Sequence, residues 1–537
     1  MLISFCMLPQ VYAYVGDSYP RYVGADRGKD NYQPVGNQTR TKPIGKIPQV
    51  AHTYQYFDAC FGMMNEHGVA MQESTCTART KGAKPRTLGG AALWYTDELS
   101  RVALERCTTA RCSVQLMGEL AVAGGFYGED NVEGTGESLI VTDSAEAWVF
   151  HVLASDSNGT SAVWAAQRVP EGHVAVVPNI FQIRGMDLSD GANYLASPNI
   201  HALAVKNKWW DPAKEPFDFT KAYSDGEYNH RYYSGRRWWG AMKMLVPAAR
   251  FVWKPDYEDL RLDAPYPFSV DARDPTTGAG TVASEDVAGV MRSFYEGTPF
   301  DQTAGMAAGP FGNPNRYDGM VASPGQPGIR GAWERTIAIY RTTYSFVSEF
   351  DDRLPASTGA VMWWGPLMAA TTPLVPFFAG QDSLPLAYSV GHKGGPIDKS
   401  SAMWASRFVQ MTSNIRFDHM YADIRELEGA LHGTGREMVT QQQRASAAGH
   451  LPKGVSASAL AAAANAHAAM CVKSWWALAD HLMYKYADGQ IYADTPSTVG
   501  AGAAKPAGYP VWWLRAVGYA DGPPPPVAGV VVQRSIY

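Results

Sequence analysis

Cysteine and surplus charge are both scarce in this sequence. Its 537 residues include 6 cysteines, and 46 Lys and Arg residues nearly balance 51 Asp and Glu residues, for a formal net charge of -5. Six cysteines are too few for a scaffold of this length to be built from disulfides. A slightly acidic chain has no general attraction for nucleic acid, because phosphate binding requires concentrated Lys and Arg. With 46% hydrophobic residues, the sequence predicts a large globular protein of enzyme size, with no nucleic-acid partner.

An uninterrupted apolar run that could cross a membrane is also missing. The uncharged stretch 354–381 has sufficient length, but Pro366, Pro373 and Pro376 lie inside it, and each removes a backbone donor. We therefore predict buried strands and turns there, and no membrane span. A second uncharged run, 455–472, is rich in alanine and predicts a long packed helix.

The first residues say little about location. Residues 1–8 are apolar but have no basic residues before them, and Pro9 follows directly, so they form a poor signal peptide. Asn37 and Asn158 begin glycosylation sequons, which matter only in a secreted protein. The compartment stays open, with a secretory or lysosomal-type lumen slightly favoured if the true N-terminus has a signal.

Hydrophobic periodicity predicts a chain of mixed α and β structure. Residues 60–73 have the pattern of two strands joined by a tight Asn-Glu-His-Gly turn, and residues 138–152 alternate around an Asp-Ser turn. Residues 89–123 have helical spacing, and two long helical segments are expected within 401–486. A further helix is expected to begin at Ser284, a favourable N-cap. Strands followed by helices and more strands predict sheets covered by helices.

Motifs of several other enzyme classes are absent or fail in context. Gly278-Ala-Gly280 fits a loose dinucleotide fingerprint, but a polar stretch precedes it where a strand is required. The sequence has no complete phosphate loop, no serine elbow, and no His-x-x-x-His pair beside a Glu. Cys107 and Cys112 lack a second cysteine pair, so helical packing, or a disulfide in an oxidising compartment, is favoured over metal binding. We predict no cofactor and no metal.

One hairpin makes the interpretation more specific. The run Met64-Asn-Glu-His-Gly-Val-Ala-Met-Gln-Glu-Ser-Thr75 resembles the asparagine–glutamate–x–glycine strand pair of the cysteine dipeptidases with an N-terminal nucleophile. That family includes lactobacillal dipeptidase A and the secernins, and is distantly related to penicillin and bile-salt amidases. Further similar segments follow in the family's order, and the resemblance covers about residues 11–514. These segments are 168–179, which leads to the family's functional asparagine, 286–301, 341–364 and 401–404.

The resemblance implies a fold, an activity and a set of site residues. The fold is α+β, a four-layer αββα sandwich of the N-terminal-nucleophile hydrolase type with a helical C-terminal region. The activity is that of a cysteine-type dipeptidase on short peptides, in which an N-terminal cysteine attacks the peptide carbonyl and its own α-amino group acts as base. Asn179 is implied as the oxyanion or substrate anchor, assisted by backbone N–H groups near Glu73 and Ser74. Arg341 is implied to orient the nucleophile or the substrate carboxylate.

The residues alone leave other roles open for two of these positions. Asn179 could be a turn residue after Pro178, and Arg341 could form a structural ion pair. On the basis of the resemblance, the chain is predicted to have five parts. These are the N-terminal part of the hydrolase domain without its first strands (1–201), an insertion rich in aromatic residues, Pro and Gly with one helix (202–330), a return to core strands (331–400), a helical C-terminal region (401–515) and a Pro-rich tail (516–537).

The family's first segment, Cys-Thr followed by an Asp-Gly-Ser turn, has no counterpart in this sequence. Cys6 lacks a following Thr, and Cys60 and Cys76 flank the hairpin, where we expect them to be buried small hydrophobes. We therefore find no nucleophile in the sequence and expect an N-terminally truncated chain that is inactive as it stands. The alternatives are a non-catalytic, secernin-like interaction protein and an amidase that acts on non-peptide acyl amides. The sequence does not predict the oligomeric state.

Overall fold

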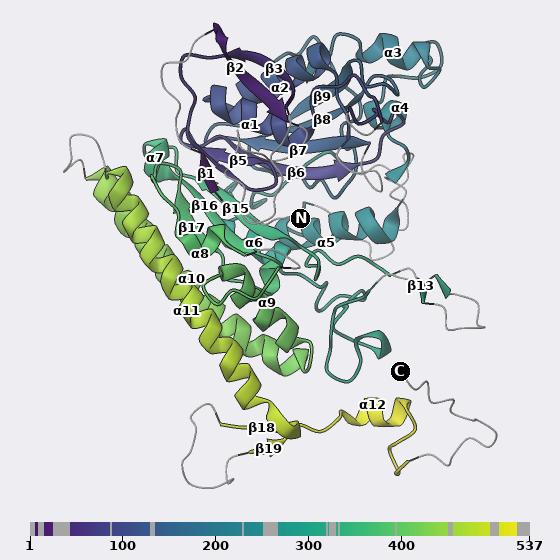
Figure 1. The fold of residues 1–537 in the computed structure, drawn as a ribbon. Coiled ribbons are helices and arrows are strands. Elements are labelled where there is room, and N and C mark those ends of the chain that lie inside the picture. The colour runs from purple at the N-terminus through teal and green to yellow at the C-terminus, as the bar shows by residue number, and fades with distance from the viewer. Residues whose placement is uncertain are drawn as a thin grey trace.

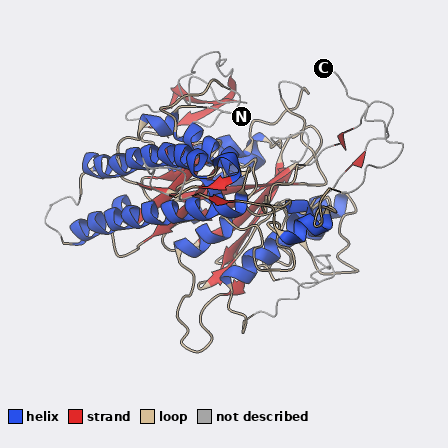
Figure 2. Ribbon diagram, turned by 90° about the horizontal axis from the view of Figure 1, so that it is seen from below, coloured by secondary structure: helices blue, strands red, loops and turns tan. Residues whose placement is uncertain are grey.

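The computed structural model of this protein shows a mixed α+β fold (Figures 1 and 2), as the sequence predicts at that level. The residues that the structure describes are 6–8, 16–24, 43–85, 88–128, 135–227, 230–250, 267–317, 320–321, 329–330, 333–391, 395–448, 455–493 and 504–523.

The N-terminal half is organised around an eight-stranded sheet with the order β1-β4-β5-β6-β7-β8-β9-β11. Both predicted hairpins are present, as β5-β6 and β7-β8, and Gly68 closes the first turn with φ 77°, a conformation that strains other residues. The strands are β1 (Cys6–Leu8), β4 (Tyr56–Asp58), β5 (Gly62–Asn65), β6 (Ala70–Cys76), β7 (Gly136–Thr142), β8 (Ala147–Ala154), β9 (Ala162–Val169) and β11 (Tyr194–Ala196).

Side chains alternate along these strands, so the two faces of the sheet pack against different helices. Met71 and Val141 face one side and share a buried cluster with α1 (Thr96–Arg106) and α2 (Ala110–Gly124). On the other face, residues of β8 and β9 pack with the segment after β10 (His173–Val174) and with two short helices. Those helices are α3 (Ile200–Lys206) and α4 (Phe219–Tyr223).

A second, three-stranded sheet packs against the β4–β6 end of the large sheet. Met63 of β5 and Trp363 of β16 belong to the same buried cluster, which also includes residues of three C-terminal helices. The longest two of these helices, α10 and α11, lie side by side (Figure 1). The strands are β15 (Tyr344–Phe350), β16 (Ala360–Pro366) and β17 (Val375–Phe378), and the helices are α9 (Ala402–Ser413), α10 (Phe417–Ala447) and α11 (Ala457–Lys485).

The uncharged stretch 354–381 forms the short helix α7, then β16, the turn η4 and β17. Its two strands are buried, as predicted. Within the described part of the chain, every helix is too short or too polar to span a bilayer. The remaining elements are β2 (Gly16–Gly24), β3 (Pro43–Gln49), η2 (Arg231–Gly235), α5 (Arg236–Leu245), β12 (Val270–Asp271), α6 (Ser284–Met291), η3 (Met306–Ala308), β13 (Met320–Val321), β14 (Ile329–Arg330), α7 (Ala356–Gly359), η4 (Ala369–Thr371), α8 (Leu386–Ser389), η5 (Ala487–Gly489), β18 (Gln490–Ile491), β19 (Lys505–Pro506) and α12 (Val511–Ala516).

The two long helices expected within 401–486 are present as α10 and α11, and the shorter helix α9 precedes them. The backbone leaves the helical conformation at Arg416, between α9 and α10, with φ -151° and ψ 71°. One expectation about the helices was wrong in detail. Ser284 is the first residue of α6 and not its N-cap. The carboxylate of Asp286 accepts the Ala283 N–H instead, so the helix start is stabilised by an acid in its first turn.

Two other expectations concern the cysteines beside the β5-β6 hairpin and the C-terminal tail. Cys60 is only half-buried, because it lies in the turn between β4 and β5, whereas Cys76 is fully buried as predicted. The Pro-rich tail lies outside the described residues from position 524 onward. The five-part division of the chain stays a prediction.

Candidate functional site

Asn179 lies shortly after β10 and has φ 58°, in the left-handed region that is costly for residues other than glycine. Its main-chain N–H donates to Ser74 Oγ over 2.9 Å, and its side-chain Nδ2 donates to the Thr75 carbonyl over 2.6 Å. Ser74 Oγ in turn donates to the carbonyl of Val177 over 2.8 Å. These bonds hold the strained segment against β6.

Asn179 reaches an edge of β6 that β5 covers at one position. β6 pairs with β7 along residues 70–76, whereas within the described residues β5 and β6 pair only at Met64 and Ala70. The Thr75 carbonyl points away from β7, because Asn179 donates to it. In an antiparallel strand the main-chain groups of Glu73 point the same way as those of Thr75, and those of Ser74 point toward β7.

Arg335 connects Asn179 to a second strained residue. Its Nη1 donates to Asn179 Oδ1 over 3.3 Å, and its main-chain carbonyl accepts a hydrogen bond from the Tyr295 hydroxyl. Tyr295 also has a positive φ, 66°. Backbone strain that the surrounding structure maintains is concentrated at functional sites. The convergence of two strained residues on Arg335 therefore marks this region as the candidate site.

Tyr233 contacts two guanidinium groups at this site. The guanidinium carbon of Arg237 is 4.6 Å and that of Arg335 4.4 Å from the centre of its ring. Tyr233 belongs to the π-helical turn η2, a conformation found frequently at functional sites. Arg237 also donates to the carbonyl of Pro178, next to Asn179. Burial, and to a smaller extent the nearby charge of Arg335, lower the pKa of Arg237 to about 9.

A cavity of about 40 Å³ opens beside Arg335, and Arg341 forms part of its wall. The structure therefore brings Arg341 close to the site, but the hydrogen bond to Asn179 comes from Arg335. Sequence reasoning did not single out Arg335, because no motif or periodicity surrounds Trp333-Glu-Arg-Thr336.

The Glu73 side chain lies on the opposite face of β6 from Ser74, as alternation requires. Thr75 Oγ1 donates to its carboxylate over 2.7 Å, and Glu137 lies within hydrogen-bonding reach. Removal from water raises the pKa of Glu73 above its usual range, although these hydrogen bonds lower it in part. Only the main chain of Glu73 faces Asn179.

Cys76, Ser138 and His151 form a buried polar network that resembles the reactive cysteine–histidine pair of a thiol enzyme. Cys76 Sγ is 3.0 Å from Ser138 Oγ, which is 2.6 Å from His151 Nδ1. His151 Nε2 accepts the N–H groups of Gln182 and Ile183, at 2.9 and 3.3 Å. Because Nε2 is an acceptor, the ring proton is on Nδ1 and the ring is neutral.

The burial of this network shows that it is structural. Burial lowers the pKa of His151 to about 3, and burial raises the pKa of the Cys76 thiol. A thiol with a raised pKa remains protonated and is a poor nucleophile. The network holds the segment that follows Asn179, just as Ser74 holds the segment before it.

Cys471 is a poor nucleophile for the same reason, because burial raises the pKa of its thiol to about 12. Cys6 lies in β1, and the sheet order places β4 and β5 between β1 and β6. The described residues also contain no group of three or more His, Cys, Asp or Glu side chains arranged to hold a metal ion.

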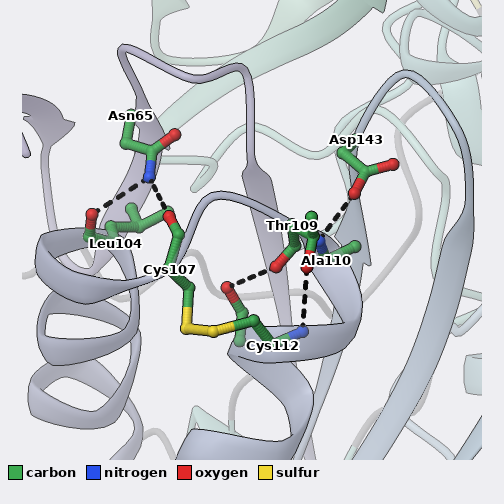
Figure 3. The surroundings of a disulfide bond; sticks show 8 residues. Asn65, Leu104, Cys107, Thr109, Ala110, Cys112 and Asp143 are labelled. Atoms are coloured by element: carbon green, nitrogen blue, oxygen red, sulfur yellow. Dashed lines mark hydrogen bonds between the residues drawn. A yellow bond between two sulfur atoms is a disulfide. The ribbon is translucent and has the colours of Figure 1, made fainter.

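Cys107 and Cys112 form a disulfide between α1 and α2 (Figure 3), one of the two alternatives that the sequence left open. Asn65, from the turn of the β5-β6 hairpin, donates its side-chain amide to the carbonyls of Leu104 and Cys107, at 3.0 and 2.8 Å. These bonds satisfy carbonyl groups at the C-terminal end of α1, which have no partner within the helix. The hairpin asparagine is thus a structural residue that joins the sheet to α1.

Comparison with known proteins places these elements in one family. The profile of peptidase family C69 matches residues 40–429. The chain is 26% identical over 307 residues to a probable dipeptidase of Salmonella dublin, 25% over 292 residues to a probable dipeptidase of Latilactobacillus sakei, and 25% over 380 residues to a dipeptidase of Bifidobacterium longum.

These matches cover 57%, 54% and 69% of this chain, and 59%, 52% and 60% of the three relatives. The chain thus spans between half and two thirds of the length of the curated relatives that it matches. The family match includes the β5-β6 hairpin, Asn179, Arg335 and Arg341. It confirms the family indicated by the ordered sequence motifs: the chain belongs to peptidase family C69.

Proposed function

We propose that this protein is a cysteine-type dipeptidase that hydrolyses short peptides on an αββα sandwich of the N-terminal-nucleophile hydrolase type. The packing supports this layering, because α1 and α2 share a buried cluster with one face of the large sheet, and the β4–β6 end shares another with the small sheet and α9–α11. The names of the relatives in three bacteria support dipeptide hydrolysis.

The observation that carries this proposal is the contact of Asn179 with Ser74 and Thr75, residues 105 and 104 positions away. It places a side-chain amide beside the open edge of β6, where the main-chain groups of Glu73 also point. Fixed N–H donors that converge on one point stabilise a carbonyl oxygen as it becomes negative. In this proposal Asn179 anchors the substrate carbonyl, the Glu73 N–H assists, and Ser74 positions Asn179 through its hydroxyl.

The reaction would proceed by acyl transfer through sulfur. A thiolate attacks the carbonyl carbon, the amine leaves with a proton, and water then releases the acid. Arg335 holds Asn179 through Oδ1 and thereby orients Nδ2, while Arg341 lies farther along the cavity wall, where it can interact with the substrate. The attacking thiol is not assigned to Cys76 or Cys471, because burial raises the pKa of both.

Amino-acid release from dipeptides tests the proposal. The protein should hydrolyse dipeptides, and iodoacetamide should inhibit it by alkylating the thiol. Asn179→Ala should lower kcat by about 10²-fold or more, the usual cost of removing an oxyanion donor. Asn199→Ala is a matched control, because Asn199 also donates its amide to a strand carbonyl, that of Ala162, but is not part of the site. Activity that resists alkylation would contradict a cysteine mechanism.

A non-catalytic interaction protein on the same scaffold is the second candidate. It is favoured by the burial of Cys76 and Cys471. It predicts that the protein does not hydrolyse dipeptides and that thermal unfolding nevertheless shows an intact fold.

A further inference from the structure

The long helix α11 has one face in the core and a second face that the described part of the chain leaves exposed. Its buried face shares a cluster with β16 and β17, to which it contributes Leu460, Ala464, Ala468, Cys471, Trp475, Leu478 and Leu482. On the opposite side, exposed residues follow one another at intervals of four and three positions, the spacing of the seam between two paired helices. This outer stripe consists of Ala466, Met470, Lys473, Ala477, Asp480 and Tyr484.

The outer stripe is less polar than the solvent-facing side of an ordinary surface helix. Met470 and Tyr484 expose 41% and 39% of their surface, and Ala477 lies between them. A surface helix carries polar and charged residues opposite its buried face, whereas a helix that is apolar on both sides is covered on both. The composition of the stripe therefore indicates that another protein surface packs on it.

The two charged residues of the stripe, Lys473 and Asp480, define what that surface must offer. Both are exposed, and neither side chain has an ion pair or a hydrogen bond with another described residue. They lie seven positions apart, which is two helical turns or about 10 Å along the axis. A surface that covers the stripe must place an acid beside Lys473 and a base beside Asp480, because a covered charge without a partner is costly.

A second copy of the same stripe meets this requirement when the two helices run antiparallel. A two-fold axis between positions 476 and 477 is equally distant from Lys473 and Asp480, so Lys473 of each copy lies opposite Asp480 of the other. A parallel pair in register would place like charges opposite one another, which is unfavourable. Two-fold contacts join the same surface of both copies, as this arrangement does.

The apolar residues of α11 fit the same axis. Ala477 lies beside the axis, where its small side chain allows the two helices to approach to the usual distance of about 8–10 Å. Met470 of each copy lies level with Met483 of the other, since both are equally far from the axis, and Met483 is 58% exposed. Methionine side chains are flexible and fill irregular gaps. Apolar contacts thus lie on both sides of each ion pair.

We propose that the protein forms a two-fold symmetric dimer in which the outer stripe of α11 packs antiparallel against the outer stripe of a second copy. The inference does not depend on the proposed function. Asn179 is held against β6 of the large sheet, whereas α11 packs on the small sheet.

Sedimentation equilibrium of the full chain over a range of concentrations tests the dimer. The wild type should follow a monomer–dimer equilibrium. Lys473→Asp and Asp480→Lys should each weaken dimerisation by about tenfold or more, because each variant places like charges opposite one another twice. The double variant Lys473→Asp/Asp480→Lys should recover the wild-type dissociation constant to within about threefold. An equimolar mixture of the two single variants should also dimerise, since opposite charges meet again in the mixed pair.

Cross-linking at the axis tests the register. Ala477→Cys should form a disulfide between two copies in oxidised glutathione, because the axis brings the two positions within reach of that bond. Ala430→Cys is the matched control, since Ala430 is exposed on the neighbouring helix α10, and it should migrate as a monomer in a non-reducing gel. Glu426→Lys, at another exposed position of α10, is the control for Asp480→Lys and should leave the dissociation constant unchanged. Thermal unfolding shows whether each variant is folded.

Three outcomes would contradict the inference. A wild-type protein that stays monomeric at every concentration would overturn it. A dimer that neither single charge reversal weakens would also overturn it, because the contact would then lie on another surface. If both single variants dissociate but neither the double variant nor the mixture recovers, the two charges do not meet across the contact and the antiparallel pairing is wrong.

Discussion

The side-chain amide of Asn179 donates a hydrogen bond to the main-chain carbonyl of Thr75 over 2.6 Å, and this contact fixes a left-handed residue against the edge of β6. The two residues come from segments 104 positions apart. Because the conformation is strained, it persists only through its partners. Variants at Asn179 can therefore separate the contribution of the backbone from that of the side chain.

Asn179→Gly should destabilise the protein less than Asn179→Ala. Both lose the bonds to Thr75 and Arg335, but alanine in the left-handed region costs about 1 kcal/mol more than glycine. Urea unfolding measures this difference. Equal losses would show that the backbone relaxes at this position. In the dipeptidase assay both variants should be impaired equally, because neither has the amide.

Ser74→Ala should reduce the free energy of unfolding by about 1–2 kcal/mol. The change leaves the Asn179 N–H and the Val177 carbonyl without the hydroxyl that each of them bonds. Urea unfolding with Ser144→Ala as control provides the comparison, because Ser144 is exposed in the β7-β8 turn. A loss no larger than in the control would mean that the segment is held by other contacts.

The stability of the protein should fall below neutral pH in part because of His151. Its folded-state pKa is lowered to about 3, while the unfolded side chain has a pKa near 6.5. The unfolded state therefore binds one more proton between these values, and this group destabilises the fold by about 1.4 kcal/mol for each pH unit below roughly 6.5. The free energy of unfolding of the wild type, measured relative to that of His151→Gln, should therefore fall by that amount for each pH unit. Parallel curves of unfolding free energy against pH for the two proteins would contradict this prediction.

Glu73 should have the opposite pH dependence. Its folded-state pKa is raised, mainly by removal from water, so the stability of its neutral form is present at acidic pH and is lost as pH rises above about 4.5. Glu73→Gln keeps the side chain neutral. Its melting temperature relative to wild type should be higher at pH 8 than at pH 4.5. Glu119→Gln, at an exposed position on α2, is the matched control. If the difference in melting temperature between Glu73→Gln and wild type were the same at both pH values, the prediction would be wrong.

Reduction of the Cys107–Cys112 disulfide should lower stability modestly. The bond closes a loop of five residues in sequence separation, and the chain-entropy model gives roughly 2 kcal/mol for a loop this short. Urea unfolding with and without dithiothreitol measures the loss. The unfolding midpoint of Cys112→Ser, which has no disulfide to reduce, should be the same in both conditions. An unchanged midpoint for the wild type on reduction would show that the α1-α2 turn is fixed by Asn65 and its other contacts.

The sequence by itself determined the local elements and the family. The β5-β6 and β7-β8 hairpins, the buried strands of 354–381 and the long helix α11 follow from alternation, turn residues and helical spacing, since neighbours in the chain produce them. The break between α9 and α10 did not follow from the helical spacing of this region. Residues near the break make contacts with distant segments, since Asn414 accepts hydrogen bonds from Asn313 and Asn315, about 100 positions away.

Only the tertiary structure decided how the candidate site is built. Asn179 was indicated by its motif, but its partner Arg335 is 156 positions distant and has no local signal. Cys76 and His151 resemble a reactive pair until burial shows that the thiol is protonated and the ring is neutral. Burial, backbone strain and charge balance arise from contacts between distant segments. A pattern of residue types predicts which elements form, and packing decides which side chains meet and in what protonation state.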